Sequence, residues 1–240
     1  MSLSNRSVTA VITAFNEEAT VASAIAATNE ALARFTDDYE ILVVNDGSRD
    51  RTGAIADACA RANARVRPLH NPENRNLGYN LRRAVAEARK DYTFAFVSAD
   101  NYPSPEHFQN LLDAIGKRDV VIGYLVGYGN RTWFRRLLSI VFTRMMNLLF
   151  GNRIRYYNGP LIVRTAVWRT VPMTVGGFAY MAEVTATLLK RGVSYTEVPF
   201  TLTPERKGAN FRMLRRNTGS VLLAIVSMFW RLNIKKQYYV

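Results

Sequence analysis

Short apolar runs alternate with longer mixed segments over the first half of the chain. The runs are rich in branched and aromatic residues and predict buried strands at residues 8–14, 40–44, 66–69, 94–97 and 120–122. The segments between them predict helices at residues 17–34, 51–62, 77–90 and 105–116. Strands that alternate with helices at this spacing predict right-handed crossovers and a mostly parallel sheet flanked by helices. The pattern therefore indicates an α/β fold.

The second half begins with a long helical pattern at residues 132–150. Its polar positions recur every three or four residues and form one narrow stripe: Thr132, Arg136, Ser139, Thr143 and Asn147. The wide apolar face around this stripe is typical of a helix in a membrane interface, and a core helix of an ordinary domain is the alternative. Beyond it we expect a strand at 161–163, a helix at 180–191 and a strand at 195–198.

Apolar runs as long as a membrane span are missing from the sequence. No run reaches 18 residues, so we expect no conventional membrane-spanning helix. The nearest candidate, residues 221–230, would be a helix roughly 15 Å long, half of a ~30 Å hydrocarbon core. Residues 1–8 contain no apolar segment of secretory length. The segment at 221–230 could therefore touch a membrane without crossing it.

Composition narrows the class of protein further. Hydrophobic residues make up 48% and charged residues 21%, which is ordinary globular usage and excludes a disordered chain. The single cysteine, Cys59, and the two histidines, His70 and His107, exclude a disulfide framework and a Cys/His metal centre. This usage is consistent with a reducing cytoplasm.

Charge is divided unevenly between the two halves. The net charge is +13, yet residues 1–120 carry −2 and residues 121–240 carry +15. Residues 121–182 contain eight arginines and no acid, and the tail from residue 206 contains eight Lys and Arg and no acid. Basic clusters beside apolar helices favour anionic lipid head groups, each basic residue contributing about 1 kcal/mol near the surface. A nucleic-acid-binding protein is the weaker alternative, since the sequence contains no recognised motif of that class.

Polar segments follow three of the predicted strands. They are F-N-E-E at 15–18, N-D-G-S at 45–48 and S-A-D-N at 98–101. Ligands bind outside the carboxyl ends of strands in such sheets, so these segments predict a site at one edge. Capping of the following helices is the alternative for any single segment. A nucleotidyltransferase is disfavoured, because residues 14–18 contain neither Gly nor Lys.

In order and spacing these segments resemble family 2 glycosyltransferases of the GT-A (Rossmann-like) fold. The resemblance rests on V-I-T-A-F-N-E-E, V-V-N-D-G-S-R-D-R-T and S-A-D-N-Y-P-S-P-E, and it extends to N-R-N-L-G-Y-N-L-R, G-F-A-Y-M-A-E and E-V-P-F. The chain looks most like polyprenyl-phosphate sugar transferases such as the dolichyl-phosphate mannose synthases. The resemblance implies one domain at 1–205, with a nucleotide-sugar half at 1–123 and an acceptor half at 124–205. A membrane-associating tail at 206–240 would follow, with amphipathic interfacial helices in the C-terminal half.

The resemblance also implies the donor site. The nucleotide-binding residues would be Ala14, Phe15, Asn16, Glu17, Asp46 and Ala99. Asp100 matches the last acid of the family's D-x-D motif and would hold Mg²⁺ or Mn²⁺ on the diphosphate of a UDP- or GDP-sugar. Ser98 stands in place of the first acid, which lowers the expected metal affinity. Arg206 and Lys207 fall near the family's basic residue on the diphosphate.

The acceptor is less closely defined. The resemblance implies inversion by in-line attack on the anomeric carbon. A lipid phosphate acceptor is already anionic and needs cations, for which we expect Arg131, Arg135 and Arg136. A hydroxyl acceptor would need a base, and Glu183 is the candidate. The sequence thus predicts sugar transfer to a polyprenyl phosphate at the cytoplasmic face of a membrane. A soluble hydroxyl acceptor and a catalytically weak relative are the alternatives, and no nucleic-acid partner is expected.

Overall fold

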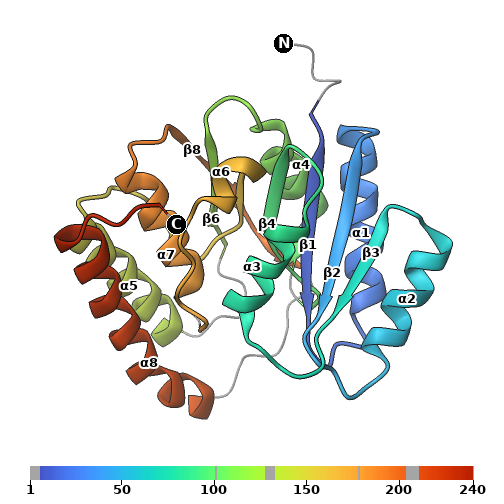
Figure 1. The fold of residues 1–240 in the computed structure, drawn as a ribbon, viewed down its shortest axis with the longest axis horizontal. Helices are drawn as coiled ribbons and strands as arrows, with labels where there is room; N and C mark the ends of the chain where they lie inside the picture. Colours follow the sequence, from blue (N-terminus) through green and yellow to red (C-terminus); the bar gives the residue numbers. More distant parts are fainter. Residues whose placement is uncertain (1–5, 101, 128–132, 178, 204–210, 240) are drawn as a thin grey trace.

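One large sheet organises the molecule (Figure 1). The computed structural model describes residues 6–100, 102–127, 133–177, 179–203 and 211–239. The strands of the large sheet are β1 (Val8–Ala14), β2 (Tyr39–Asn45), β3 (Val66–His70), β4 (Tyr92–Ser98), β6 (Val120–Leu125), β7 (Leu161–Arg164) and β8 (Tyr195–Phe200). In this described part they lie in the order β3-β2-β1-β4-β7-β6-β8. Two short strands, β5 (Tyr102–Pro103) and β9 (Leu202–Thr203), pair antiparallel in a second sheet.

Helices cover both faces of the large sheet. They are α1 (Val21–Phe35), α2 (Thr52–Ala62), α3 (Leu77–Glu87), α4 (Pro105–Asp113), α5 (Trp133–Phe150), α6 (Thr165–Arg169), α7 (Tyr180–Lys190) and α8 (Phe211–Phe229), followed by a π-helical turn η2 (Trp230–Ile234). Helices α1, α2 and α4 pack in one core, and α3, α5, α6, α7 and α8 pack in the others. Along β1, Ile12 and Val11 point to opposite faces, as the two-residue period of a strand requires.

The predicted α/β architecture is confirmed, with one difference in strand direction. Strand β7 runs antiparallel to both β4 and β6. A short apolar run has the same pattern in either direction, so its direction could not be predicted. Helix α1 begins at Val21 rather than at residue 17, because Asn16 has a positive φ of 55° and the chain turns there before the helix starts.

The later part of the polar stripe of α5, at Thr143 and Asn147, turns toward the protein, whereas Arg136 is exposed and much of the apolar surface faces outward. Thr143 is buried, and Asn147 donates from Nδ2 to the carbonyl of Ile154 at 2.8 Å. On the outer side Leu148 is 85% exposed. The predicted helix is therefore confirmed from Trp133 onward, whereas Thr132 lies outside the described residues.

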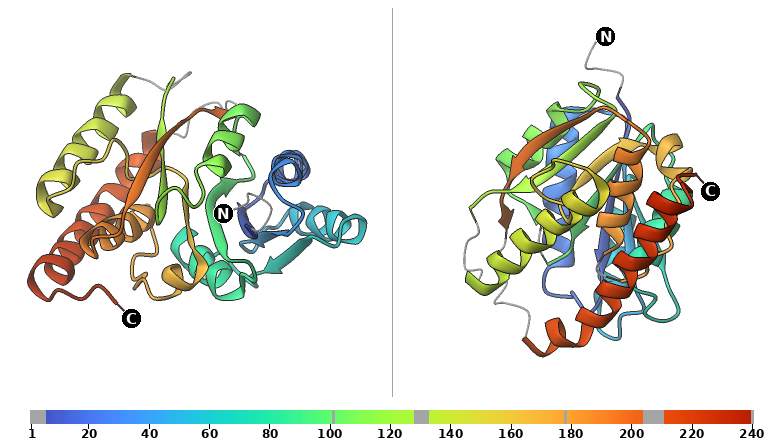
Figure 2. Two further views of the ribbon diagram at one scale, coloured as in Figure 1. Left: turned by 90° about the horizontal axis from the view of Figure 1, so that it is seen from above. Right: turned by 90° about the vertical axis from the view of Figure 1, so that its left-hand side faces the viewer.

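Helices α5 and α8 lie side by side at one end of the molecule, opposite α1 and α2 (Figures 1 and 2). The rings of Phe150 and Phe229 pack with centroids 6.4 Å apart, and Asn233 donates to the carbonyl of Leu149 at 2.9 Å. Leu223 of α8 is 73% exposed. Among the described residues, every helix is too short or too polar to cross a bilayer.

Candidate active site

The polar segments predicted to form a site meet at the end of β1. The backbone N–H of Asp46 donates to the carbonyl of Ala14 at 2.9 Å, and that of Ala99 donates to the carbonyl of Thr13 at 3.0 Å. Asp46 follows β2 and Ala99 follows β4, so they flank β1 from its two sides. Two strand spacings put these backbones about 10 Å apart at one edge of the sheet.

The segment after β1 is fastened to the segment after β2. The N–H of Asn16 donates to Ser48 Oγ at 3.0 Å, and the N–H of Glu17 donates to Thr52 Oγ1 at 2.8 Å. Asn16 Oδ1 in turn accepts from the N–H of Arg49 at 2.9 Å. These bonds hold the left-handed turn at Asn16 and leave Phe15 44% exposed. The turn therefore presents an aromatic ring at the site edge.

Asp46 is nearly buried and held by two donors. Its Oδ1 accepts from Asn71 Nδ2 and from the N–H of Arg75, both at 2.8 Å. Gly47, with φ of 70°, allows this approach, because a Cβ there would lie 2.5 Å from the backbone of Glu73. The role of Asn71 was missed from the sequence, and only its position just after a predicted strand could have indicated it.

Asp100 lies half-buried beside Ser98, whose hydroxyl donates to Oδ1 of Asp100. Among the described residues no group of three or more His, Cys, Asp or Glu side chains could hold a metal. A single carboxylate nevertheless fits Mg²⁺ or Mn²⁺, because such ions commonly take one or two carboxylates and complete their shell with substrate phosphates and water. The donor set here suits a cation that arrives with a diphosphate.

The predicted cationic residues are only partly described. Arg131, Arg206 and Lys207 lie outside the described residues. Arg135 is half-buried and Arg136 is exposed, both in the first turn of α5. These two arginines therefore lie at the start of the helix whose outer surface is apolar.

Glu183 is placed differently from what a general base requires. Its side chain is 0% exposed in the first turn of α7. It accepts from the N–H groups of Thr174 and Val175, both at 2.9 Å, and pairs with Arg231 of η2. An acceptor hydroxyl would have to displace these donors to reach the carboxylate. In this structure the carboxylate of Glu183 thus binds the loop before α7, and its role as a base toward a hydroxyl acceptor stays a prediction.

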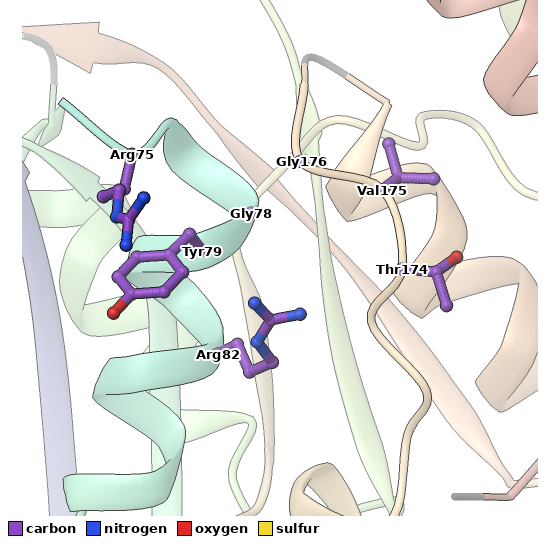
Figure 3. Close-up of a pocket in the computed structure, with 7 residues that line it drawn as sticks. All are labelled: Arg75, Gly78, Tyr79, Arg82, Thr174, Val175 and Gly176. Atoms are coloured by element: carbon purple, nitrogen blue, oxygen red, sulfur yellow. The ribbon is translucent and has the colours of Figure 1, made fainter.

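A cavity of about 310 Å³ lies between α3 and this loop (Figure 3). Arg75, Tyr79 and Arg82 line it from α3 and the residues just before it, and residues 174–176 line it from the loop. Gly78 permits the close approach, because its N–H donates to the carbonyl of Gly176 at 3.0 Å and a Cβ there would lie 2.1 Å from the carbonyl oxygen of Val175. The sequence indicated Gly78 but not the two arginines, because Arg75 precedes the helix, Arg82 lies within it, and only the approach of the loop brings both to one cavity.

Comparison with known proteins finds a matching family and several relatives. The family model described as glycosyl transferase family 2 matches residues 9–174. Polyprenol monophosphomannose synthase of Mycolicibacterium smegmatis is 31% identical over 188 residues, which cover 71% of this chain and 69% of that protein. A dolichyl-phosphate beta-glucosyltransferase of Trichomonas vaginalis is 26% identical over 210 residues, covering 80% of this chain and 62% of that protein.

A solved structure matches nearly the whole chain. Glucosyl-3-phosphoglycerate synthase from Mycobacterium tuberculosis, in complex with Mn²⁺, uridine diphosphate and phosphoglyceric acid, superposes with a TM-score of 0.75. The match covers 94% of this chain and 79% of that chain at 19% identity. At this identity the likeness concerns the fold alone.

Proposed function

The chain belongs to glycosyl transferase family 2 and has the GT-A fold, and on that basis we propose that it transfers a sugar from a nucleotide diphosphate sugar to a polyprenyl phosphate. In this proposal residues 1–123 bind the donor, and residues 124–205 with the tail 206–240 serve the acceptor. The observation that carries it is the sheet edge at which Asp46 and the Ala99–Asp100 turn flank β1.

The donor lies along this edge. Ala14, Phe15, Asn16 and Glu17 border the base and ribose, and Asp46 accepts a hydrogen bond from the base. Asn71 and the N–H of Arg75 keep the Asp46 carboxylate oriented for this task. Ala99 lies beside the nucleotide, and Asp100 is directed to the diphosphate. This placement of a nucleotide is supported by the structural neighbour, which was crystallised with uridine diphosphate.

A divalent cation suits the Asp100 position, with Ser98 beside it. Such an ion, when bound, neutralises the negative charge that the leaving nucleoside diphosphate acquires. Arg206 and Lys207 remain candidates for sharing this role. The structural neighbour's Mn²⁺ supports a divalent cation.

The acceptor is the phosphate of a polyprenyl chain. One of its oxygens forms a bond to the anomeric carbon while the bond from that carbon to the diphosphate breaks, so the configuration inverts. A phosphate oxygen is already anionic near neutral pH and needs no proton removed. This chemistry accords with the buried, ion-paired state of Glu183. Arg131, Arg135 and Arg136 are candidates for gripping the phosphate.

Membrane association follows from the outer surfaces of α5 and α8. Leu148 and Leu223 are among their most exposed apolar side chains, and the C-terminal half carries most of the positive charge. Apolar side chains inserted into the head-group region, with basic residues around them, match an anionic bilayer surface. This association would bring the enzyme to a lipid acceptor.

A transfer assay tests the proposal. The protein is incubated with radiolabelled nucleotide sugars, one at a time, and with a polyprenyl phosphate, and the organic phase is counted. We expect label in the organic phase for one donor of the panel. Label that stays in the aqueous phase with every donor would contradict the proposal.

A further inference from the structure

The groove between α3 and the loop at residues 174–176 carries a concentration of positive charge. Arg75, just before α3, and Tyr79 and Arg82 of α3 lie on one side of it (Figure 3). The guanidinium carbons of Arg75 and Arg82 lie 5.4 and 5.6 Å from the centroid of the Tyr79 ring. The lining of the groove contains no acidic side chain. Both cations are thus held against one aromatic ring.

Each guanidinium group keeps donors available for a ligand. Arg82 donates from Nη1 to the carbonyl of Met173 at 3.1 Å, and Arg75 pairs through Nη1 with Glu73 at 3.0 Å. An arginine has five N–H donors in a planar fork, so one contact leaves most of the fork unused. Planar forks of this kind match the oxygens of a phosphate group.

The opposite wall of the groove is fixed. The carboxylate of Glu183 binds the N–H groups of Thr174 and Val175, and Gly78 donates to the carbonyl of Gly176. The side chains of Thr174 and Val175 point away from α3 (Figure 3). The groove is therefore bounded by loop backbone on this side, and a ligand would enter a preformed space of about 310 Å³.

The groove adjoins the donor edge and an apolar cavity. The N–H of Arg75 donates to the Asp46 carboxylate, so the groove begins beside a proposed donor residue. The same loop also lines a second cavity of about 360 Å³, whose other wall includes Val221, Leu223 and Ala224 of α8. One short loop thus separates a cationic groove from an uncharged, mostly apolar cavity that also includes Ser220 and Ser227.

From this arrangement we propose that Arg75 and Arg82, with Tyr79, form a binding subsite for the phosphate monoester of the acceptor. The inference rests on the proposed function, which it extends by assigning the acceptor's phosphate to α3 as well as to α5. The ligand chemistry is a phosphate dianion, which a lipid head group or a free phosphate could supply. The neighbouring apolar cavity favours the lipid.

Calorimetric titration with farnesyl phosphate, a soluble short-chain probe, tests the subsite. The wild type is compared with Arg75→Gln and Arg82→Gln at constant ionic strength and with saturating uridine diphosphate. Arg61→Gln, an exposed position in α2, is the matched control. We expect each groove variant to lose about tenfold in affinity, a typical effect of one charge-assisted contact, while Arg61→Gln binds like the wild type. In the transfer assay the groove variants raise the acceptor KM and leave the donor KM unchanged.

Inorganic phosphate and farnesol identify the source of the ligand. Tighter binding of farnesyl phosphate than of inorganic phosphate, with no binding of farnesol, supports a lipid head group. Equal binding of the two phosphates supports the subsite with a free phosphate as its ligand. Farnesyl phosphate affinity unchanged in Arg82→Gln, or farnesol binding as tight as farnesyl phosphate, overturns the subsite.

The two proposals fail in different ways. A wild type that binds farnesyl phosphate through Arg82 but transfers no sugar from any donor contradicts the proposed function and leaves the subsite standing. A wild type that transfers sugar to polyprenyl phosphate, with the acceptor KM unchanged in both groove variants, contradicts the subsite and leaves the function standing.

Discussion

Arg231 of the π-helical turn forms an ion pair with Glu183, whose carboxylate is completely buried at the start of α7. The side chain of Arg231 is itself only 11% exposed. The same carboxylate binds the N–H groups of Thr174 and Val175. The two partners lie 48 residues apart in the sequence, and through the contacts of Glu183 the pair joins the C-terminal helical segment to the loop that lines both cavities.

Removal of one partner of this pair should destabilise the fold. Arg231→Gln leaves the Glu183 carboxylate buried beside an uncharged side chain, a change that typically costs about 3–5 kcal/mol. Urea unfolding measures the free energy of unfolding, and Lys235→Gln, an exposed position just after η2, is the control. An Arg231→Gln protein as stable as the Lys235→Gln protein would show that the pair contributes nothing to stability.

Asp100→Asn should abolish sugar transfer and leave the fold intact. The amide cannot neutralise a cation at the diphosphate, and loss of one electrostatic contact to a developing charge typically lowers kcat by about a hundredfold or more. Asp113→Asn, an exposed position on α4, should keep wild-type activity. Treatment with a chelator should reduce sugar transfer by the wild type, and addition of Mg²⁺ or Mn²⁺ should restore it. Full activity of Asp100→Asn would remove this residue from the donor site.

Gly78→Ala should displace the loop at residues 174–176. The added Cβ would lie 2.1 Å from the carbonyl oxygen of Val175, a contact that the backbone must relieve by moving. Overpacking of this kind costs about 1–3 kcal/mol. Gly176→Ala is the matched control, because a Cβ there meets nothing within 4 Å. Thermal unfolding should separate the two variants, and equal melting temperatures would contradict the close approach.

Stability should fall in alkaline solution in a way that depends on Tyr157. Burial raises the pKa of Tyr157 to about 12. Because the folded-state pKa lies above the unfolded value near 10, the folded chain holds this proton more tightly, and the stabilisation is lost as the pH rises from 10 to 12. Unfolding in urea at pH 8 and pH 11 measures the effect. Tyr157→Phe should show a smaller pH dependence than the wild type, and an equal dependence would contradict the assignment.

Binding to anionic vesicles should depend on the outer surfaces of α5 and α8. Leu148→Glu and Leu223→Glu put a negative charge on exposed positions of these helices, so each should weaken binding. Ala54→Glu, exposed on α2 at the far end of the molecule, adds the same charge and should bind normally. Wild-type binding should also weaken as salt increases, because lipid electrostatics are screened. Cosedimentation with the vesicles measures the bound fraction of each variant. Equal binding by all variants would exclude α5 and α8 from the membrane contact.

Local patterns in the sequence were sufficient to predict the sheet and the edge at which its polar segments meet. Apolar runs marked the strands, and the polar residues directly after β1, β2 and β4 lie together because parallel strands end at the same edge. The antiparallel direction of β7 was not predictable, because its short apolar pattern is the same in both directions. Nor was the inward turn of the α5 polar stripe, because Asn147 finds its partners at residues 154 and 157, in the loop beyond the helix.

Contacts between residues far apart in the sequence were not predicted, for a related reason. Glu183 was identified as a candidate base, but its partner Arg231 lies in the basic tail, where each residue also fits a solvated cluster. Arg75 and Arg82 form a groove only because Gly78 lets the loop before α7 approach α3. The sequence contains these residues without the tertiary contact that brings them together.

The most direct measurement compares two acceptors that differ only in the phosphate. With the preferred nucleotide sugar, the wild-type protein is supplied with a polyprenyl phosphate or with the corresponding polyprenol, and label in the organic phase is counted. We expect rapid transfer to the polyprenyl phosphate and none to the polyprenol, since the carboxylate of Glu183, the candidate base, is buried and paired with Arg231. Transfer to the polyprenol at an equal rate, or to neither lipid, would contradict an account in which an anionic phosphate oxygen attacks a donor held between Asp46 and Asp100.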